Sequence, residues 1–145
     1  MTFYTLALII HLFCAIIFIG FVFADVMVLP VMKKVLDTDT LQKVKTTISN
    51  RARSIFPPSV LILILSGGFM LSKYINSEVG FFNSPLQQLL VFKTLLASII
   101  VAGIVYSLTC KFFKKQPATF MQHFHPFVLT VGIFIVILAK IMFVI

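Results

Sequence analysis

The chain has 145 residues, of which 60% are hydrophobic and 11% are charged, and its formal net charge at pH 7 is +8. Soluble domains contain about 45–50% apolar and about 25% charged residues, so this composition excludes a water-soluble fold. It predicts an integral membrane protein with a single domain over residues 1–145. The positive charge does not indicate a nucleic-acid partner, because most basic residues lie in two clusters that join apolar stretches, as in loops facing lipid headgroups.

Four apolar stretches are each long enough to cross the hydrocarbon core of a bilayer, which is about 30 Å thick, as a helix. We expect transmembrane helices over about 3–30, 55–75, 86–111 and 124–145. The predicted fold class is therefore all-α, an integral membrane protein built as a four-helix bundle.

A short amphipathic helix is predicted between the first two spans. The basic residues of this stretch lie off an apolar stripe. The apolar residues of the stripe recur at helical spacing: Leu41, Val44, Ile48 and Ala52. Asp37 and Asp39 lie at its start, where the helix dipole favours negative charge. We expect this helix to lie in the membrane interface.

The third span has a well-specified start. Ser84 is expected to be the N-cap, with Pro85 at the first helical position and Gln87 two positions later. This spacing is typical of a capping box, in which the serine and glutamine side chains bind the unpaired backbone N–H groups of the first turn.

The basic residues also predict an orientation. The first and third connections carry most of them: Lys33, Lys34, Lys43, Lys45, Arg51 and Arg53, then Lys111, Lys114 and Lys115. Because basic loops stay on the cytoplasmic side, both termini are expected outside the cytoplasm, in a bacterial inner membrane.

Three ionisable residues lie at similar depths in the predicted spans. His11 and Lys93 are each about six or seven residues from the outer ends of their spans, and Lys140 is five residues from the C-terminus. An ionisable residue inside a membrane is costly and is a functional candidate by default. The shared depth is the most informative feature of the sequence.

A histidine and a lysine at one depth can supply two axial ligands to haem, for which imidazole is a common ligand. Lysine binds iron only as the neutral amine, which burial in lipid favours. The structural alternatives are an interhelical hydrogen bond for His11 and a side chain that reaches to the interface for Lys93. Lys140 is close enough to the end of its span for its side chain to reach the interface as well.

Copper is the other cofactor that the residues suggest. Cys14 lies three residues after His11, on the same helix face, and a thiolate beside an imidazole suits Cu(I). His123 and His125 flank the inner start of the fourth span and could form a second site. The structural alternative is a packing role for Cys14 and interfacial positions for the two histidines.

Asp25 lies near the inner end of the first span. Arg51 and Arg53 lead into the second span at the same membrane surface, so a structural ion pair with Asp25 is expected. A proton-relay role for Asp25 and a lipid-phosphate contact for either arginine are the alternatives.

These residues together resemble the four-helix domain of the CopD copper-resistance family and, more distantly, the HemJ-type protoporphyrinogen oxidases. The resemblance covers nearly the whole chain and rests on apolar spans with the following pattern: His11, Gly20, Leu29-Pro30, Arg51, Arg53, Pro57, Ser66-Gly67, Leu90, Lys93 and Leu95-Leu96. The HemJ-type resemblance implies haem b binding through His11 and Lys93. The CopD resemblance implies copper movement across the inner membrane.

Three functions follow as hypotheses. The first is a b-type haem protein that acts in electron transfer or redox chemistry. Such a protein would interact with a redox partner, with a membrane-protein complex or with further copies of itself. The second is a copper permease or copper-resistance protein that uses His11, Cys14, His123 and His125. The third is a small accessory or assembly subunit. The chain contains no paired carboxylates, catalytic triad or phosphate loop, so no reaction is assigned.

Overall fold

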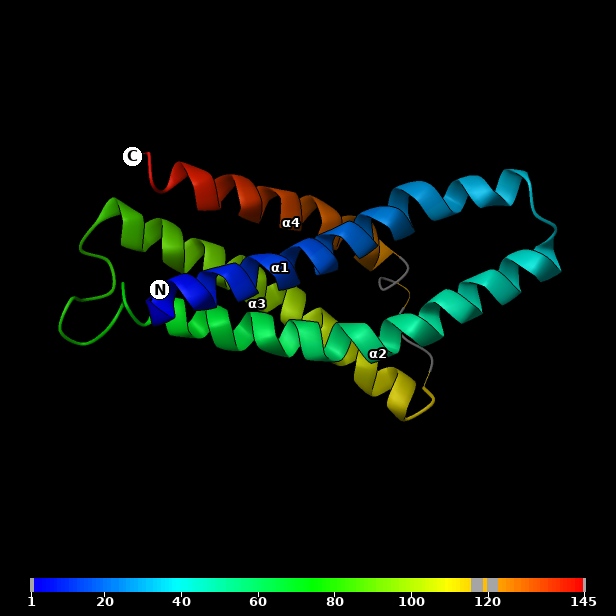
Figure 1. The fold of residues 1–145 in the computed structure, drawn as a ribbon, viewed down its shortest axis with the longest axis horizontal. Helices are drawn as coiled ribbons and strands as arrows, with labels where there is room; N and C mark the ends of the chain where they lie inside the picture. Colours follow the sequence, from blue (N-terminus) through cyan, green and yellow to red (C-terminus); the bar gives the residue numbers. More distant parts are fainter. Residues whose placement is uncertain (1, 116–118, 120–122, 145) are drawn as a thin grey trace. The chain divides into compact units, whose positions relative to one another are not determined.

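A computed structural model describes residues 2–115, 119 and 123–144, and Figure 1 shows their path. Its elements are α1 (Phe3–Phe23), the π-helical turn η1 (Ala24–Val28), the 3₁₀-helix η2 (Leu29–Lys34), α2 (Thr38–Leu71), α3 (Pro85–Phe112) and α4 (Phe124–Ile141). Within these described residues there is no β-strand. The stretch from α1 to η2 and the three other helices are each long and apolar enough to cross a membrane. The predicted all-α fold with four membrane-spanning helices is confirmed.

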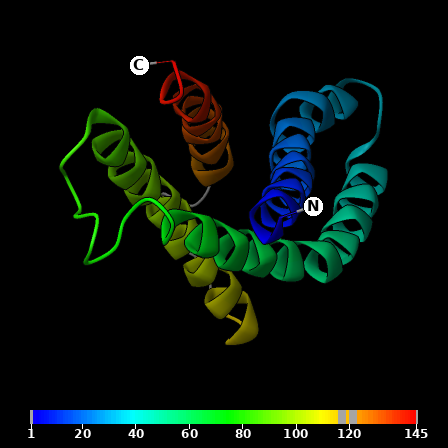
Figure 2. The ribbon, with the colours of Figure 1, turned by 60° about the vertical axis from the view of Figure 1, so that its left-hand side comes forward.

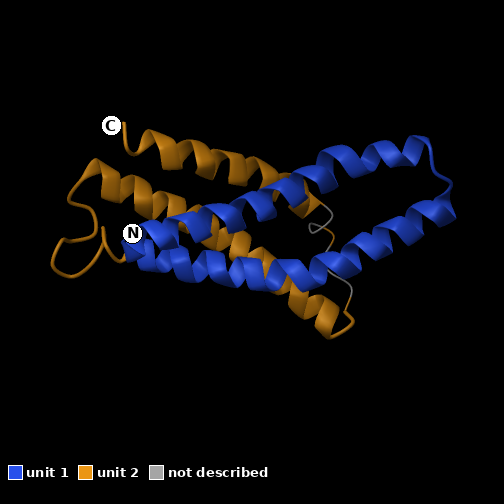
Figure 3. Ribbon diagram, in the orientation of Figure 1, with its two compact units in different colours: residues 1–70 blue, residues 71–145 orange. Residues whose placement is uncertain are grey.

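The chain divides into two compact units, residues 1–70 and residues 71–145, which Figure 3 colours separately. Unit 1 contains α1, η1, η2 and nearly all of α2. Unit 2 contains the following loop, α3 and α4. Each unit is a helical hairpin, and the single domain over residues 1–145 stays a prediction.

Large apolar side chains cover the outer surface of each helix. Examples are Phe13, which is 64% exposed, Leu65 at 64%, Leu95 at 59% and Val136 at 54%. A soluble protein rarely exposes so much contiguous apolar surface, whereas lipid chains solvate it. The exposure is therefore what a bilayer-embedded chain requires.

Unit 1 begins with a helix whose geometry changes near its end. The N–H of Leu29 donates to the carbonyl of Ala24, five residues earlier, and this wider π-turn is followed by η2. Pro30 lies in the first turn of η2. Proline has no N–H and its ring clashes with the carbonyl four residues before it, so Pro30 disfavours a regular α-helix at this point.

The stretch predicted as a separate interfacial helix is helical, but it forms the N-terminal half of α2. One helix runs from Thr38 to Leu71 with Pro57 and Pro58 inside it. The prolines remove two backbone hydrogen bonds and bend the helix without ending it, and Figure 2 shows α2 changing direction between its cyan and green parts. The predicted boundary between the interfacial helix and the second span is thus a bend within one helix.

Asp37 caps the start of α2, whereas the sequence predicted only a favourable charge at the helix start. Its carboxylate accepts a hydrogen bond from the backbone N–H of Thr40 at 3.0 Å. The backbone and side-chain hydrogen bonds from Thr40 lower the pKa of Asp37 below its ordinary value of 3.8.

The cap should respond to acid in a defined direction. Because the folded state lowers the pKa of Asp37, the cap is fully formed above the ordinary value and is lost as the pH falls through the lowered one. We expect the amide chemical shift of Thr40 to titrate in that acidic range. Asp37→Asn, which keeps a capping oxygen, should abolish this titration and retain the helix start. An unchanged titration in the variant would assign it to another group.

Unit 2 confirms the predicted capping box at the start of α3. Ser84 accepts a hydrogen bond from the N–H of Gln87, and the side-chain oxygen of Gln87 accepts one from the N–H of Ser84. The side-chain nitrogen of the same glutamine donates to the carbonyls of Tyr74 and Gly80, at 3.0 and 3.2 Å. Gln87 is only 3% exposed. One side chain therefore fixes both the helix start and the loop before it.

The roles of the oxygen and the nitrogen of the Gln87 side-chain amide can be separated by substitution. Gln87→Glu keeps the oxygen that caps α3 but loses the donor to the two loop carbonyls. We expect it to lower the free energy of unfolding by about 2 kcal/mol, because the carbonyls of two half-buried loop residues lose their partner. Hydrogen exchange should increase across residues 74–82 and remain low at the start of α3. Gln87→Ala is expected to raise exchange in both segments, and equal patterns in the two variants would contradict this assignment.

The α3–α4 contact depends on one small residue. An added Cβ at Gly103 would overlap the ring of Phe124, at Cε2 and Cζ, and Phe124 is itself buried. Phe92 and Phe134 meet edge to face, with ring centroids 6.4 Å apart. Small residues let lipid-embedded helices approach closely, and Gly103 has this role here.

Candidate functional site

His11 forms a hydrogen bond between the two helices of unit 1. Its Nδ1 lies 3.0 Å from the hydroxyl oxygen of Ser66 in α2. His11 is half-buried and Ser66 is buried. The two residues are 55 positions apart in the sequence, and the antiparallel path of α1 and α2 brings them to one level.

The hydrogen bonds of Ser66 and the tautomer of His11 are linked. The Ser66 hydroxyl oxygen lies 2.6 Å from the carbonyl of Ile62 and 3.3 Å from that of Leu63. A hydroxyl has one hydrogen, so when it donates to Ile62 it accepts from Nδ1 of His11, and the lone pair of that neutral ring lies on Nε2. When the hydroxyl donates to Nδ1 instead, the ring proton lies on Nε2.

Gly67 lies directly against the same imidazole ring. An added Cβ at this position would be 3.0 Å from Cε1 and 3.5 Å from Nδ1 of His11. The neighbouring Gly68 has no atom within 4 Å of its own added Cβ. The Ser66-Gly67 pair thus provides both a hydrogen-bond acceptor and the space that the ring needs.

This arrangement has the chemistry of an oriented imidazole ligand. Metal-bound histidines almost always donate their other ring N–H to an oxygen, which fixes the tautomer and the ring orientation. In the tautomer with the proton on Nδ1, Ser66 accepts from Nδ1 and the basic nitrogen is Nε2. The donor set therefore fits a haem with imidazole as an axial ligand. It equally holds α1 against α2, as the structural alternative for His11 expects.

The helix bounds give the positions of His11, Lys93 and Lys140 within their own helices. Lys93 lies eight residues after Pro85, the first residue of α3, and His11 lies eight residues after Phe3, the first residue of α1. Lys93 is half-buried. Lys140 is exposed and lies one residue before the end of α4, where its amine can reach the interface. His11 and Lys93 thus lie equally far from the first residues of their own helices, and their shared depth in a membrane stays a prediction.

The copper candidates lie in contrasting environments. Cys14 is buried in α1, whereas His123 and His125 are exposed at the start of α4. Among the residues that the structure describes, no group of three or more histidine, cysteine, aspartate or glutamate side chains is arranged to hold a metal ion. Copper binding by these residues stays a prediction.

Asp25 occupies the π-helical turn η1 and is half-buried. Arg51 and Arg53 are exposed on α2. The predicted ion pair between Asp25 and these arginines stays a prediction. Single π-turns within helices are frequent at functional sites, so the location of Asp25 in such a turn makes it a functional candidate.

Sequence reasoning did not assign a role to Ser66 or Gly67, although both belong to the resembling pattern. A signal was present, because Ser66 is a polar residue within an uncharged span, five residues before the end of α2 at Leu71. Polar and small residues in spans mark helix contacts. The partner of His11 could have been sought among such residues at the outer level of the other spans.

Comparisons with family models, with curated proteins and with solved structures find no match to this chain.

Proposed function

We propose that the chain is a b-type haem protein of the bacterial inner membrane that acts in electron transfer, with both termini outside the cytoplasm. Nε2 of His11 would be one axial ligand and the amine of Lys93 the other. When bound, haem supplies reversible one-electron chemistry at its iron. The resemblance to CopD and HemJ-type proteins motivates the same proposal.

The observation that carries this proposal is the hydrogen-bonded state of His11. A histidine that only links two helices needs one hydrogen bond with either nitrogen. In this chain, donation by the Ser66 hydroxyl to the Ile62 carbonyl goes with the Nδ1–H tautomer of His11, in which Nε2 carries the lone pair. This is the state that an axial imidazole requires.

Lys93 is proposed as the second ligand from its depth in α3 and its half-buried side chain. The protein residues have three tasks in this proposal. Ser66 orients the imidazole, Gly67 leaves space beside it, and the apolar span around Lys93 favours the neutral amine that iron needs. Apolar surroundings would also keep water away from the iron.

The test compares absorption spectra of the wild-type protein and Lys93→Met, purified from haem-replete cells. The wild type should give a low-spin b-type spectrum. Lys93→Met should retain haem with a shifted spectrum and potential, because a thioether replaces the amine. Lys93→Ala should give a high-spin spectrum. An unaltered low-spin spectrum in Lys93→Met would remove Lys93 from the ligand set.

A metal assay on the same samples separates the remaining hypotheses. Stoichiometric copper without haem, lost in Cys14→Ser, would favour the copper hypothesis over this proposal. A protein with neither metal would favour the accessory-subunit hypothesis, in which the His11–Ser66 bond only fixes helix packing. Unchanged cellular function after combined substitution of His11 and Lys93 would support that outcome.

A further inference from the structure

The helices of unit 1 are longer than a membrane crossing requires. The stretch Phe3–Lys34 has 32 residues and α2 has 34, which at about 1.5 Å per residue correspond to about 48 Å and 51 Å. The hydrocarbon core is only about 30 Å thick. Part of this hairpin must therefore lie outside the core or run obliquely at its edge.

Both arms of the hairpin change near one cluster of aromatic rings, because α1 passes into the π-turn η1 and α2 bends at its proline pair. Phe56 of α2 packs against Phe18 and Phe21 of α1, with ring centroids 5.9 and 4.5 Å apart. The π-turn of η1 begins three residues after Phe21, and the proline pair follows Phe56 directly. These contacts divide the hairpin into a regular part and a second part, residues 24–54, which we call the hairpin tip.

The hairpin tip combines positive charge with exposed aliphatic side chains. It contains six basic side chains against three acidic ones, a formal net charge of +3, and all six basic side chains are exposed. Four exposed aliphatic residues of η1, η2 and the following turn form what we call the apolar ridge: Met27 (57%), Val28 (54%), Val31 (56%) and Val35 (83%). All four lie within residues 27–35, on the arm that also carries Lys33 and Lys34.

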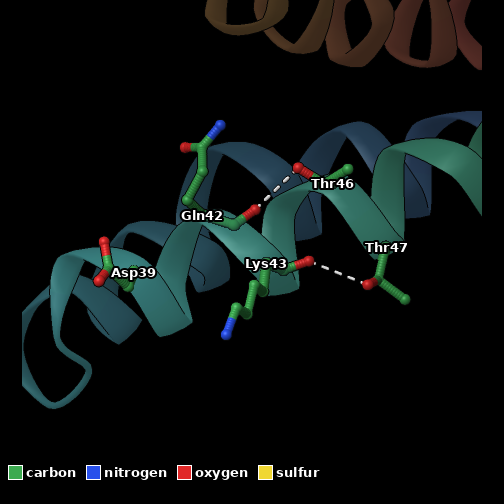
Figure 4. A pocket seen from close by; sticks show the side chains of 5 residues that line it. All are labelled: Asp39, Gln42, Lys43, Thr46 and Thr47. Carbon is green, nitrogen blue, oxygen red and sulfur yellow. Dashed lines mark hydrogen bonds between the residues drawn. The ribbon is translucent and has the colours of Figure 1, made fainter.

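The apolar stripe of α2 differs from this ridge. Leu41, Val44, Ile48 and Ala52 are half-buried, so they are shielded by the rest of the chain. Another face of the same stretch is polar and exposed, with a shallow depression lined by Asp39, Gln42, Lys43, Thr46 and Thr47 (Figure 4). The Thr46 and Thr47 hydroxyls donate to carbonyls of their own helix. The stretch predicted as the membrane-surface helix therefore offers a polar face, and the exposed apolar side chains lie on the other arm.

We propose that the apolar ridge inserts into the headgroup boundary of an anionic phospholipid leaflet, while basic side chains of the hairpin tip contact lipid phosphates. Aliphatic side chains beside Lys33 and Lys34 suit this boundary, where the chains enter the acyl region and the amines remain among the phosphates. An acidic protein partner would satisfy the charge but would not require a continuous aliphatic ridge. This proposal is independent of any cofactor.

The chain lacks tryptophan, so one introduced indole reports its own position. We would reconstitute the full chain as Val31→Trp, or as Val35→Trp if the first variant does not fold, and as Thr47→Trp for the polar-face control. The vesicles would contain phosphatidylglycerol and phosphatidylcholine, with or without brominated acyl chains. Circular dichroism would check the helix content of each variant.

The ridge tryptophan should be quenched by brominated chains and protected from acrylamide, whereas Thr47→Trp should show the reverse pattern. Replacing phosphatidylglycerol by phosphatidylcholine, or Lys33 and Lys34 by glutamine, should reduce the lipid quenching by about twofold or more. Equal acrylamide quenching of the ridge and control tryptophans in anionic vesicles would overturn the proposal. So would lipid quenching that is the same in neutral and anionic vesicles.

Discussion

Replacing Gly103 with alanine is expected to lower the free energy of unfolding by about 3 kcal/mol, because the added methyl group overlaps the buried ring of Phe124. The ring is a rigid neighbour, so relief requires α3 and α4 to separate or Phe124 to leave its position. Thermal unfolding in detergent micelles, followed by circular dichroism, measures the effect.

Gly68→Ala is the matched control for this prediction. Its added Cβ meets no atom within 4 Å, so the substitution should leave stability unchanged or raise it by up to about 1 kcal/mol through helix propensity. Phe124→Leu should partly rescue Gly103→Ala, since it removes the overlapping ring atoms, and a double-mutant cycle would quantify the coupling. Equal destabilisation by Gly103→Ala and Gly68→Ala would show that close packing at Gly103 is not the cause.

Replacing Gly67 with alanine is expected to weaken haem binding by about 10–100-fold, the usual cost of disturbing a group that orients a metal ligand. The added Cβ would lie 3.0 Å from Cε1 of His11 and push the ring away from Ser66. Ser66→Ala should have a similar effect through loss of the acceptor for Nδ1. Haem titration of the apoprotein, followed at the Soret band, measures both.

The adjacent Gly68→Ala again provides the control, and here it should bind haem like the wild type. The pair differs only in which side of α2 the new methyl group occupies. If both substitutions weaken binding equally, the loss reflects α2 as a whole rather than the contact with His11. If neither does, the imidazole does not need its Ser66 partner to bind haem.

The four spans could be predicted from the sequence because their determinants are local. Long uncharged apolar runs specify a membrane helix wherever they occur, and the Ser84-Pro85-Gln87 pattern defines the start of α3 within four residues. The position of Asp37 at a helix start was predicted on the same grounds, although its capping hydrogen bond was not. These features need no knowledge of what packs against them.

The features that the sequence did not reveal depend on contacts between distant residues. The partner of His11 is 55 residues away, and nothing in the local pattern around His11 selects Ser66 over other polar residues in the spans. Likewise, the interfacial helix and the second span were predicted as separate elements. One helix, α2, nevertheless runs through both of them and through Pro57 and Pro58. Proline weakens a helix locally and bends α2, and the packing of Phe56 on Phe18 and Phe21 of α1 lies beside this bend.

The central claim is that His11 binds haem iron, and the most direct measurement is the pyridine haemochrome of the protein purified from haem-replete cells. Wild-type protein should contain about one haem b per chain, with a Soret band and a reduced-minus-oxidised α-band. His11→Ala should lose most of this haem while Gly68→Ala retains it. Colourless wild-type protein with no haemochrome, or full haem content in folded His11→Ala, would contradict the claim.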